Sequence, residues 1–406
     1  MKQKLPQDWT ISTLSEIVKE DKPIVYGIVQ AGPHDDNGVP YLKSSDVGGE
    51  INIATLQKTS KIIHNKFKRA EVNPGDIVFS LRGNIGEKSI VPKELTIANL
   101  TQGTARISVK DNLDFKYVYY QLENPYVIEN ILKVSKGSTF REISLQALRN
   151  IQIPIANSYK EQQKIAKILS TWDAAIEKLK QLVVNKKKRK CGLIEKLFFN
   201  IRKKFKTVNL DSIGEILPSN VDKKINDVET EVRLCNYVDV YKNNKITNKI
   251  EFMVASASEQ EIKKFKVLKD DLIITKDSET AKDIAIPAYV SEDIENLVCG
   301  YHLTLVRPDS KKLFGHFLYY YFLTERSRYY FFTMANGAIR FGLSVDAFKE
   351  ASIPLPDLDT QKKIISVLNE CEEEIESTLR IINLLKTQKK GLMQQLLTGK
   401  KRVIIE

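Results

Sequence analysis

The chain has 406 residues, of which 42% are hydrophobic and 28% are charged, proportions typical of a folded protein rather than a disordered one. Its net charge of +12 indicates a polyanionic partner, most often nucleic acid. No apolar run reaches the length of a membrane span and no apolar signal core follows the first residues, so we expect a cytoplasmic protein without a membrane segment. Its four cysteines and four histidines are scattered singly, so the sequence predicts neither a disulfide framework nor a metal site.

Residues 1–157 are predicted to form one globular domain of strands and helices. Residues 9–17 have an apolar spacing compatible with either a helix or a strand. Four short strand-like runs, separated by turn-forming residues, follow at 39–42, 76–81, 88–91 and 104–109. Residues 114–133 have helical spacing, although Pro125 must kink or split that helix. A last strand over residues 151–155 completes a predicted sheet with polar loops at its edge.

Residues 158–206 are predicted to form one long helix. Its apolar residues follow the alternating three-and-four spacing of a coiled-coil seam: Ile165, Leu169, Trp172, Ile176, Leu179, Leu193 and Leu197. Gly192 is the one helix-breaking residue in this run. Such a helix is much longer than an average globular one, and its single apolar stripe requires a partner.

The partner is predicted to be a second copy of the helix, over residues 358–406. Shifting the first helix by 199 residues places Gly192 on Gly391 and superposes the apolar positions. The predicted seam of this copy consists of Ile364, Leu368, Ile375, Ile382, Leu385, Leu392 and Leu396. A basic block at 186–190 and an acidic block at 370–376 favour antiparallel packing, which places the two blocks side by side. Contact between the basic block and DNA phosphates remains an alternative.

Residues 207–357 repeat the plan of residues 1–157. The segment 72–78 matches 267–273, and 88–92 is matched to 283–287. The loops differ, with Lys43-Ser44-Ser45 set opposite Cys235-Asn236-Tyr237. We therefore predict a mixed α/β (α+β) fold, in which two similar globular domains are separated by two long antiparallel coiled-coil helices in an internal pseudo-twofold repeat. Two domains that share a backbone plan but differ in their polar loops are suited to recognising two different ligands.

The segments around the start and end of each long helix carry a family resemblance. They are Ile153-Pro154 with residues 161–177, Ile353-Pro354 with residues 361–364, and the closing residues 389–400. With these segments the whole chain resembles the specificity subunit of type I restriction-modification enzymes. The resemblance is specific in the helices and weak in the loops.

The resemblance implies two target-recognition domains, residues 1–157 and 207–357, each reading one half of a bipartite site in double-stranded DNA. The conserved helices, residues 158–206 and 358–406, would set the spacing and dock partner subunits. Those partners would be two modification (methyltransferase) subunits using S-adenosylmethionine, and restriction (endonuclease and translocase) subunits using ATP and Mg. The chain itself would be non-catalytic and would hold no cofactor.

Candidate DNA-contacting residues lie in or beside the predicted loops. Arg and Lys suit guanine and phosphate, Asn and Gln suit adenine, and aromatic rings can stack on a displaced base. The loops near 82–88 and 136–141, with their counterparts near 276–278 and 337–341, are the favoured groups. The candidates are Lys43, Ser44, Arg82, Asn84, Lys88, Gln102, Lys136, Ser138, Arg141, Asn236, Tyr237, Lys276, Ser278, Tyr301, Arg340 and Phe341.

Two other functions were weighed against DNA recognition. An enzyme is disfavoured, because Asn124-Pro125-Tyr126 lacks the second proline of the adenine-methyltransferase motif and no phosphate-binding loop exists. Glu261-Ile262-Lys263 resembles half of a nuclease site but has no convincing acidic partner upstream. The remaining alternative is a coiled-coil adaptor or scaffold without sequence-specific DNA binding, which salt-dependent duplex binding would distinguish.

Overall fold

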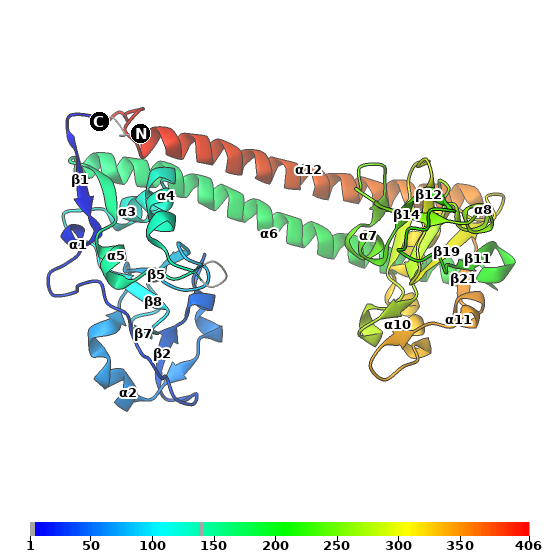
Figure 1. Ribbon diagram of the computed structural model, residues 1–406, viewed down its shortest axis with the longest axis horizontal. Coiled ribbons are helices and arrows are strands. Elements are labelled where there is room, and N and C mark those ends of the chain that lie inside the picture. Colours follow the sequence, from blue (N-terminus) through cyan, green and yellow to red (C-terminus); the bar gives the residue numbers. More distant parts are fainter. Residues whose placement is uncertain (1–4, 138–140, 406) are drawn as a thin grey trace. The chain divides into compact units, whose positions relative to one another are not determined.

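The structure is a computed structural model that describes residues 5–137 and 141–405. It divides into two compact units, unit 1 with residues 1–179 and 381–406, and unit 2 with residues 180–380. Two long helices, α6 (Tyr159–Lys204) and α12 (Leu358–Leu396), each contribute one part to each unit (Figure 1). The 46 residues of α6 form one helix that continues through Gly192.

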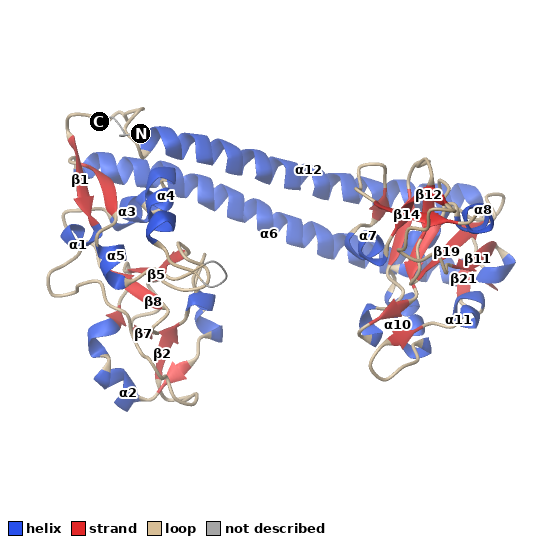
Figure 2. Ribbon diagram, in the orientation of Figure 1, coloured by secondary structure: helices blue, strands red, loops and turns tan. Residues whose placement is uncertain are grey.

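The strands of unit 1 form three small sheets (Figure 2). β1 (Trp9–Thr13) pairs antiparallel with β9 (Gln152–Ala156), which resolves residues 9–17 as a strand followed by the short helix α1 (Leu14–Ile17). A second sheet has the order β3-β2-β7-β4, and a third has the order β6-β5-β8. These strands are β2 (Val39–Leu42), β3 (Lys58–Thr59), β4 (Glu71–Val72), β5 (Ile77–Ser80), β6 (Lys88–Ile90), β7 (Ala98–Leu100) and β8 (Thr104–Ile107).

The remaining helices of unit 1 confirm the predicted break at Pro125. They are α2 (Lys61–Lys66), α3 (Phe115–Gln121), α4 (Pro125–Val134) and α5 (Leu145–Arg149), with short 3-10 turns at Ser44–Asp46, Ile53–Thr55 and Lys68–Ala70. Pro125 is the first residue of α4, where its missing N–H costs nothing. The Asn124 side chain caps α4 at the Tyr126 N–H and donates to the Leu397 carbonyl at 3.1 Å (Nδ2 to O). Asn124 is therefore a structural residue.

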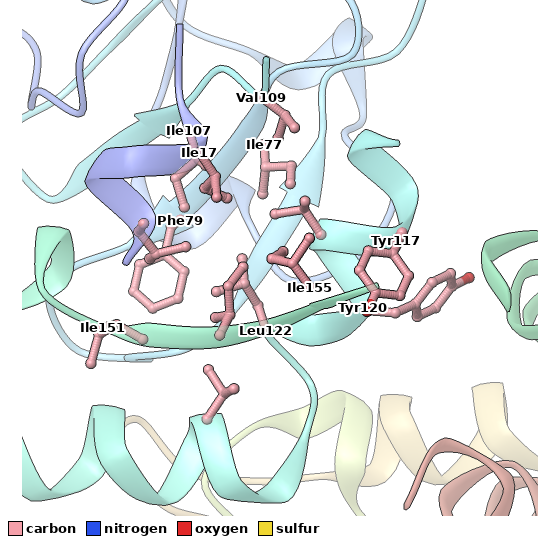
Figure 3. Close-up of a cluster of buried hydrophobic side chains, with 14 of the residues drawn as sticks. Ile17, Ile77, Phe79, Ile107, Val109, Tyr117, Tyr120, Leu122, Ile151 and Ile155 are labelled. Carbon is pink, nitrogen blue, oxygen red and sulfur yellow. The ribbon is translucent and has the colours of Figure 1, made fainter. Parts of the chain in front are cut away.

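The core of unit 1 lies between the β6-β5-β8 sheet, β9 and helix α3 (Figure 3). Ile77 and Phe79 of β5 pack there with Tyr117 of α3, whereas Val78 belongs to a second cluster around Leu42. Both faces of β5 are thus buried. The first core also contains residues from the start of α6, from the end of α12 and directly after it: Ile165, Ala166, Leu169, Met393, Leu396 and Leu397. The helices are therefore part of the folded domain.

Unit 2 has a central five-stranded sheet with the order β11-β19-β15-β17-β13, a three-stranded sheet β14-β12-β18 and two pairs, β10-β21 and β16-β20. The strands are β10 (Thr207–Asn209), β11 (Gly214–Pro218), β12 (Thr230–Cys235), β13 (Lys245–Ile246), β14 (Met253–Ala257), β15 (Leu272–Thr275), β16 (Asp277–Ser278), β17 (Pro287–Val290), β18 (Leu297–Cys299), β19 (Leu303–Pro308), β20 (Phe341–Gly342) and β21 (Ser352–Pro354). Its short helices are α7 (Tyr237–Lys242), α8 (Glu259–Phe265), α9 (Gly315–Phe322), α10 (Glu325–Met334) and α11 (Val345–Lys349), with 3-10 turns at Leu210–Ser212 and Ala281–Asp283.

In each unit the two long helices run antiparallel, as predicted. In unit 1, Lys389 forms an ion pair with Asp173 at 2.6 Å (Nζ to Oδ1). In unit 2, Arg189 bonds to Glu374 at 2.6 Å (Nη2 to Oε2), and Lys190 forms an ion pair with Glu372. The basic block therefore pairs with the acidic block. Within the described residues, none of the helices is both long enough and apolar enough to cross a membrane.

The predicted seam residues are buried to different degrees. Those that are buried are Ile165, Leu169, Ile176, Ile364, Leu368, Ile375, Ile382 and Leu396, and those that are partly buried are Trp172, Leu179, Leu193, Leu197, Leu385 and Leu392. Near the end of α6 the buried stripe moves by one residue, to Ile194 and Phe198. The reason is that this part of α6 also packs on the core of unit 2, where Phe198 contacts Phe317 with ring centroids 5.1 Å apart.

Candidate nucleic-acid interface

In unit 1 the favoured loops lie side by side. The loop after β5 is bonded to the segment after α4 through the Ile143 N–H and the Leu81 carbonyl, at 3.0 Å (N to O). Lys136 and Glu142 exchange two backbone hydrogen bonds of 2.9 Å, so these two residues lie side by side. Arg82 lies at the junction and forms an ion pair with Glu142 at 2.9 Å (Nε to Oε1).

Unit 2 repeats this backbone arrangement. The Leu343 N–H donates to the Lys276 carbonyl at 2.9 Å, as Ile143 donates to Leu81 in unit 1. Asn336 and Gly342 exchange backbone bonds of 3.0 and 2.8 Å. In the resulting ribbon of β16 and β20, Asp277 lies opposite Gly342. Residues 81, 136, 142 and 143 therefore correspond to 276, 336, 342 and 343.

A third loop joins each cluster, the turn before β8 or β19. The Leu81 N–H donates to the Gly103 carbonyl at 2.8 Å, and the Lys276 N–H donates to the His302 carbonyl at 3.0 Å. Gly103 and His302 thus occupy corresponding positions. Gln102 and Tyr301, the preceding residues in each turn, are both candidates from the sequence.

The segments after β2 and β12 also correspond, but in a different register from the predicted one. The Lys43 N–H bonds to Asp46 Oδ2, and the Asn236 N–H bonds to Asp239 Oδ2, both at 2.8 Å. Lys43 therefore matches Asn236, and Ser44 matches Tyr237. The predicted pairing of Lys43 with Cys235 is wrong by one residue, because Cys235 is the last residue of β12 and pairs with Cys299, as Leu42 pairs with Leu100.

The predicted match of residues 88–92 with 283–287 is also wrong. Lys88 pairs with Phe79 of β5, and the residue at the corresponding place in β15, Ile274, pairs with Pro287. The segment between the two strands is four residues longer in unit 2, where it contains β16 and a 3-10 turn. The match of 72–78 with 267–273 is confirmed, since Asp76 and Asp271 make the same 2.8 Å bond to the N–H three residues before them.

The candidates differ in accessibility. Arg82, Asn84, Lys136, Arg141, Tyr301 and Arg340 are exposed, and Lys43, Ser44, Gln102, Asn236, Tyr237, Lys276 and Phe341 are partly buried. Ser278 is buried in β16. Lys276 is engaged, since its Nζ donates to the Ser219 carbonyl at 2.8 Å and lies 5.0 Å from the Tyr301 ring centroid. Ser138 lies outside the described residues.

Lys88 is not available to a ligand on the surface. It is 6% exposed, and its Nζ bonds to Glu123 at 3.2 Å (to Oε1). Lys389 of α12 lies 3.6 Å from the other oxygen of that carboxylate (Nζ to Oε2). Burial lowers the pKa of Lys88, and Glu123 opposes that shift. Lys88 therefore links the globular part of unit 1 to the helix pair through Glu123. The predicted DNA contact of Lys88 did not take this burial into account.

In unit 2 three candidates line one pocket of about 490 Å³, namely Tyr237, Ser278 and Arg340. The pocket also contains residues that the sequence did not single out, including Lys223, Tyr241, Asp277 and His302. Tyr237 stacks on Tyr241 with ring centroids 5.6 Å apart. Burial raises the pKa of Tyr237, so it remains a neutral phenol. Aromatic faces beside Lys and Arg are suited to nucleic acid.

His302 and Asp277, which both line this pocket, form a short polar contact. His302 Nδ1 lies 2.6 Å from Asp277 Oδ2. A carboxylate accepts, so Nδ1 carries the hydrogen and Nε2 is the second polar atom of the ring. His302 has a φ of 73°, a conformation uncommon for a residue with a side chain. No sequence pattern marks this pair, because the residue of unit 1 that corresponds to His302 is Gly103.

Among the residues that the structure describes, no group of three or more His, Cys, Asp and Glu could hold a metal ion. Glu261 caps α8 by accepting from the Ser258 N–H at 3.1 Å, and its other oxygen accepts from Asn220 at 3.0 Å. The segment 261–263 is therefore a helix start.

Comparison with known proteins gives a family match over most of the chain. The family model described as type I restriction modification DNA specificity domain matches residues 6–186 and 202–387. The specificity subunit of the type I restriction enzyme MjaVIII from Methanocaldococcus jannaschii is 24% identical over 430 residues, covering 98% of this chain and 94% of the relative. The specificity subunit of the EcoBI enzyme from Escherichia coli is 27% identical over 183 residues, and there the chain covers only 38% of the relative's length.

Two solved structures share the fold. The crystal structure of the S subunit of a type I restriction-modification system from M. genitalium matches with a TM-score of 0.53 and 17% identity, covering 97% of both chains. A chain from a structural study of complex assembly and conformational transition in the type I system matches with a TM-score of 0.59 and 13% identity, covering 98% of this chain and all of the other. The predicted fold class is confirmed.

Proposed function

The chain belongs to the type I restriction-modification DNA specificity family, and from this membership we propose that its two globular domains each read one half of a bipartite site in double-stranded DNA. As a specificity subunit, it contributes sequence recognition and no catalysis of its own. The proposed target-recognition domains are residues 1–157 and 207–357, joined by the helices within residues 158–206 and 358–406. A cytoplasmic location fits this function, because the DNA lies there.

One observation carries the proposal: the same backbone frame presents different side chains in the two units. Four pairs of backbone hydrogen bonds fix corresponding positions around residues 81 and 276. The side chains at and beside these positions differ, for example Gly103 against His302 and Gln102 against Tyr301. A fixed frame with variable loop residues is what two readers of different sequences require.

The helix pair is the proposed docking surface for partner subunits. Each unit exposes large apolar side chains on its helix halves, such as Leu384 in unit 1 and Leu182 in unit 2. Such residues favour protein contacts. We propose one modification subunit for each unit, two in all, which hold S-adenosylmethionine, and restriction subunits that use ATP and Mg.

A domain exchange tests the proposed function. Residues 1–157 are replaced by the corresponding segment of a relative, and the full chain is expressed with its modification subunits. Methylation mapping of host DNA should then show one altered half-site and one unchanged half-site. A change in both half-sites would contradict independent reading. Failure of the unaltered chain to bind duplex DNA with a steep salt dependence would instead favour a scaffold without DNA recognition.

A further inference from the structure

Positions 82 and 277 occupy the same place in the two units. Each follows the residue that accepts a backbone hydrogen bond from the returning segment, Leu81 in unit 1 and Lys276 in unit 2. Each also lies opposite the corresponding partner residue, Glu142 for Arg82 and Gly342 for Asp277. The side chains at this shared position have opposite charge.

The partners of these two side chains are exchanged as well. In unit 1 Arg82 is held by Glu142, from the segment after α4, and the turn before β8 contributes Gly103 without a side chain. In unit 2 Asp277 is held by His302, from that same turn, and the segment after α10 contributes Gly342. Each unit therefore has one charged side chain at this position and one partner residue that pairs with it. At the place where the other unit has its partner residue, each unit has glycine.

The two glycines keep these arrangements separate. A Cβ at position 342 would lie 3.2 Å from Asp277 Oδ1, and a Cβ at position 103 would lie 2.7 Å from Ser44 Oγ. A side chain at position 342 would thus crowd the carboxylate on the side away from His302. Each unit therefore has its own pair of side chains at this place and glycine at the remaining position.

We propose that Arg82 and Asp277 determine one base pair in each half-site, with opposite hydrogen-bond polarity; this inference rests on the proposed function. Arg82 is 45% exposed along its side chain, and its guanidinium donates to guanine O6 and N7. Asp277 accepts from an exocyclic amino group, that of cytosine N4 or adenine N6. His302 orients the Asp277 carboxylate as a positioning residue, and Glu142 does so for Arg82.

The test is selection of duplexes from a randomised pool by the full-length chain, followed by sequencing. Arg82→Gln should lower the preference for guanine at one base pair of one half-site by about tenfold and leave the other half-site unchanged. Asp277→Asn should likewise change the preference at one base pair of the other half-site. The base pair that the unaltered chain selects there, C·G or A·T, shows whether Asp277 accepts from cytosine or from adenine. Arg82→Lys and Asp277→Glu are second variants that keep the charge and alter the geometry.

Matched controls change charge elsewhere on the same domains. Lys133→Gln on α4 and Asp346→Asn on α11 remove exposed charges that pair within their own helices, and both should leave the selected sequence unchanged. Unchanged base preferences in folded Arg82 and Asp277 variants would overturn the proposal. If the unaltered chain selects no sequence at all, the proposed function itself fails, which is a different result.

Discussion

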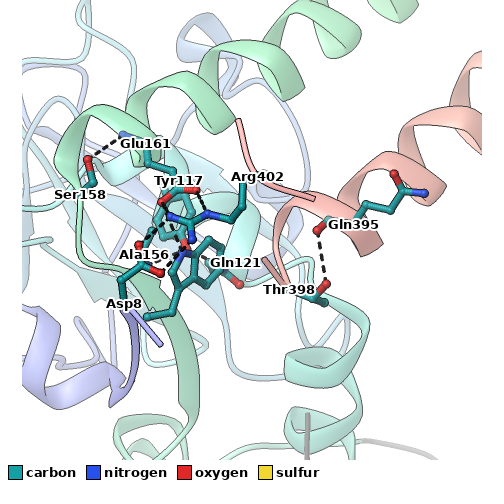
Figure 4. A network of polar contacts seen from close by, with 10 residues as sticks. Asp8, Tyr117, Gln121, Ala156, Ser158, Glu161, Gln395, Thr398 and Arg402 are labelled. Atoms are coloured by element: carbon teal, nitrogen blue, oxygen red, sulfur yellow. Dashed lines mark hydrogen bonds and ion pairs between the residues drawn. The ribbon is translucent and has the colours of Figure 1, made fainter. Parts of the chain in front are cut away.

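Glu161 at the start of α6 has a carboxylate only 1% exposed, and Arg402 from the chain's C-terminal segment balances its charge (Figure 4). The guanidinium bonds to Glu161 at 2.7 Å (Nε to Oε1) and to Asp8 at 2.8 and 2.6 Å. Trp9 Nε1 adds a bond of 3.3 Å to the same carboxylate. These bonds lower the pKa of Asp8 and raise that of Arg402. One side chain thus joins three segments of unit 1.

Removal of this guanidinium should destabilise unit 1. Arg402→Ala leaves the Glu161 carboxylate buried without its cation, which we expect to cost about 1–3 kcal/mol of the free energy of unfolding. Denaturant unfolding of the full chain measures the change. Lys401→Ala, an exposed neighbour, is the matched control and should have almost no effect. Equal stability of both variants would mean that Trp9 alone satisfies Glu161.

His316 in unit 2 is a buried residue whose protonation should make the stability of the chain depend on pH. Its ring stacks on Tyr289 with centroids 3.8 Å apart, and among the described residues its buried Nε2 has no hydrogen-bond partner. Burial, followed by the charges of Lys245 and Lys190, lowers its pKa from 6.5 to about 4. Between those values the unfolded chain binds the proton and the folded chain does not, so stability falls as the pH falls from 6.5 towards 4.

His316→Phe should remove that part of the pH dependence, because it keeps an aromatic ring and deletes the titrating group. We expect the loss of stability between pH 6.5 and pH 4 to shrink by up to about 3 kcal/mol. Unfolding curves at a series of pH values provide the measurement. Burial raises the pKa values of Asp270 and Asp271. Both residues are present in the unaltered protein and in the variant, so their contributions to the pH dependence cancel in the comparison. Parallel pH profiles for the two chains would contradict the assignment.

The side chains at the candidate interface were only partly predictable, because the sequence gives residue types but not their correspondence. Arg82 and Tyr237 could be chosen for their chemistry and their loops. Asp277 and His302 could not, since Gly103 leaves nothing in unit 1 to compare with His302. Lys88 had the right chemistry, but its burial depends on Glu123 and Lys389, which are distant in the sequence.

At the scale of elements, the helical turn divides the basic block of α6 into two groups. Lys186, Arg189 and Lys190 face α12, where Lys186 Nζ lies 3.1 Å from Thr378 Oγ1. Lys187 and Lys188 fall on the other side and are exposed. Pairing with the acidic block therefore accounts for only part of the block, and the phosphate alternative remains for the exposed pair.

Lys187→Gln with Lys188→Gln should weaken binding to all duplexes alike, because lysine contacts to phosphate carry no sequence information. If both residues contact phosphate, the slope of log affinity against log salt should fall by about 2. Titration of specific and random duplexes at several salt concentrations measures both quantities. Lys186→Gln is the control that should lower stability instead. An unchanged slope would mean that the exposed pair is only solvated.

Secondary structure was predictable where an apolar pattern extended over many residues or where a residue allowed only one backbone arrangement. The helix duplication is visible because a seam repeats over many turns, and Gln162 and Gln361 make the same bond at both helix starts, 2.8 Å to the Asp114 N–H and 3.0 Å to the Phe314 N–H. Pro125 fixed the boundary between α3 and α4. The match of residues 88–92 was not predictable, because the longer segment after β15 shifts the alignment by four residues.

At the scale of the whole molecule, the chain folds each unit from segments that lie far apart in the sequence. Unit 1 needs the end of α12 and the residue after it, Leu397, whose carbonyl accepts from Gln121 and Asn124 at 3.1 Å. Unit 2 needs the end of α6 and the start of α12 for its core. The helices are therefore anchored within both units. We expect this anchoring to make their length a determinant of the distance between the two half-sites.

Insertion of four residues into each helix tests this expectation. With one insertion after Val183 and one after Thr378, the helix pair gains about 6 Å and turns by about 40° beyond one full turn. One base pair of DNA advances about 3.4 Å and rotates by roughly 34°. The added rotation matches one base pair, and the added length lies between the rise of one and of two base pairs. Methylation mapping should therefore find both half-sites unchanged and the spacer longer by one or two base pairs. An unchanged spacer in an active complex would show that another part of the complex sets the distance.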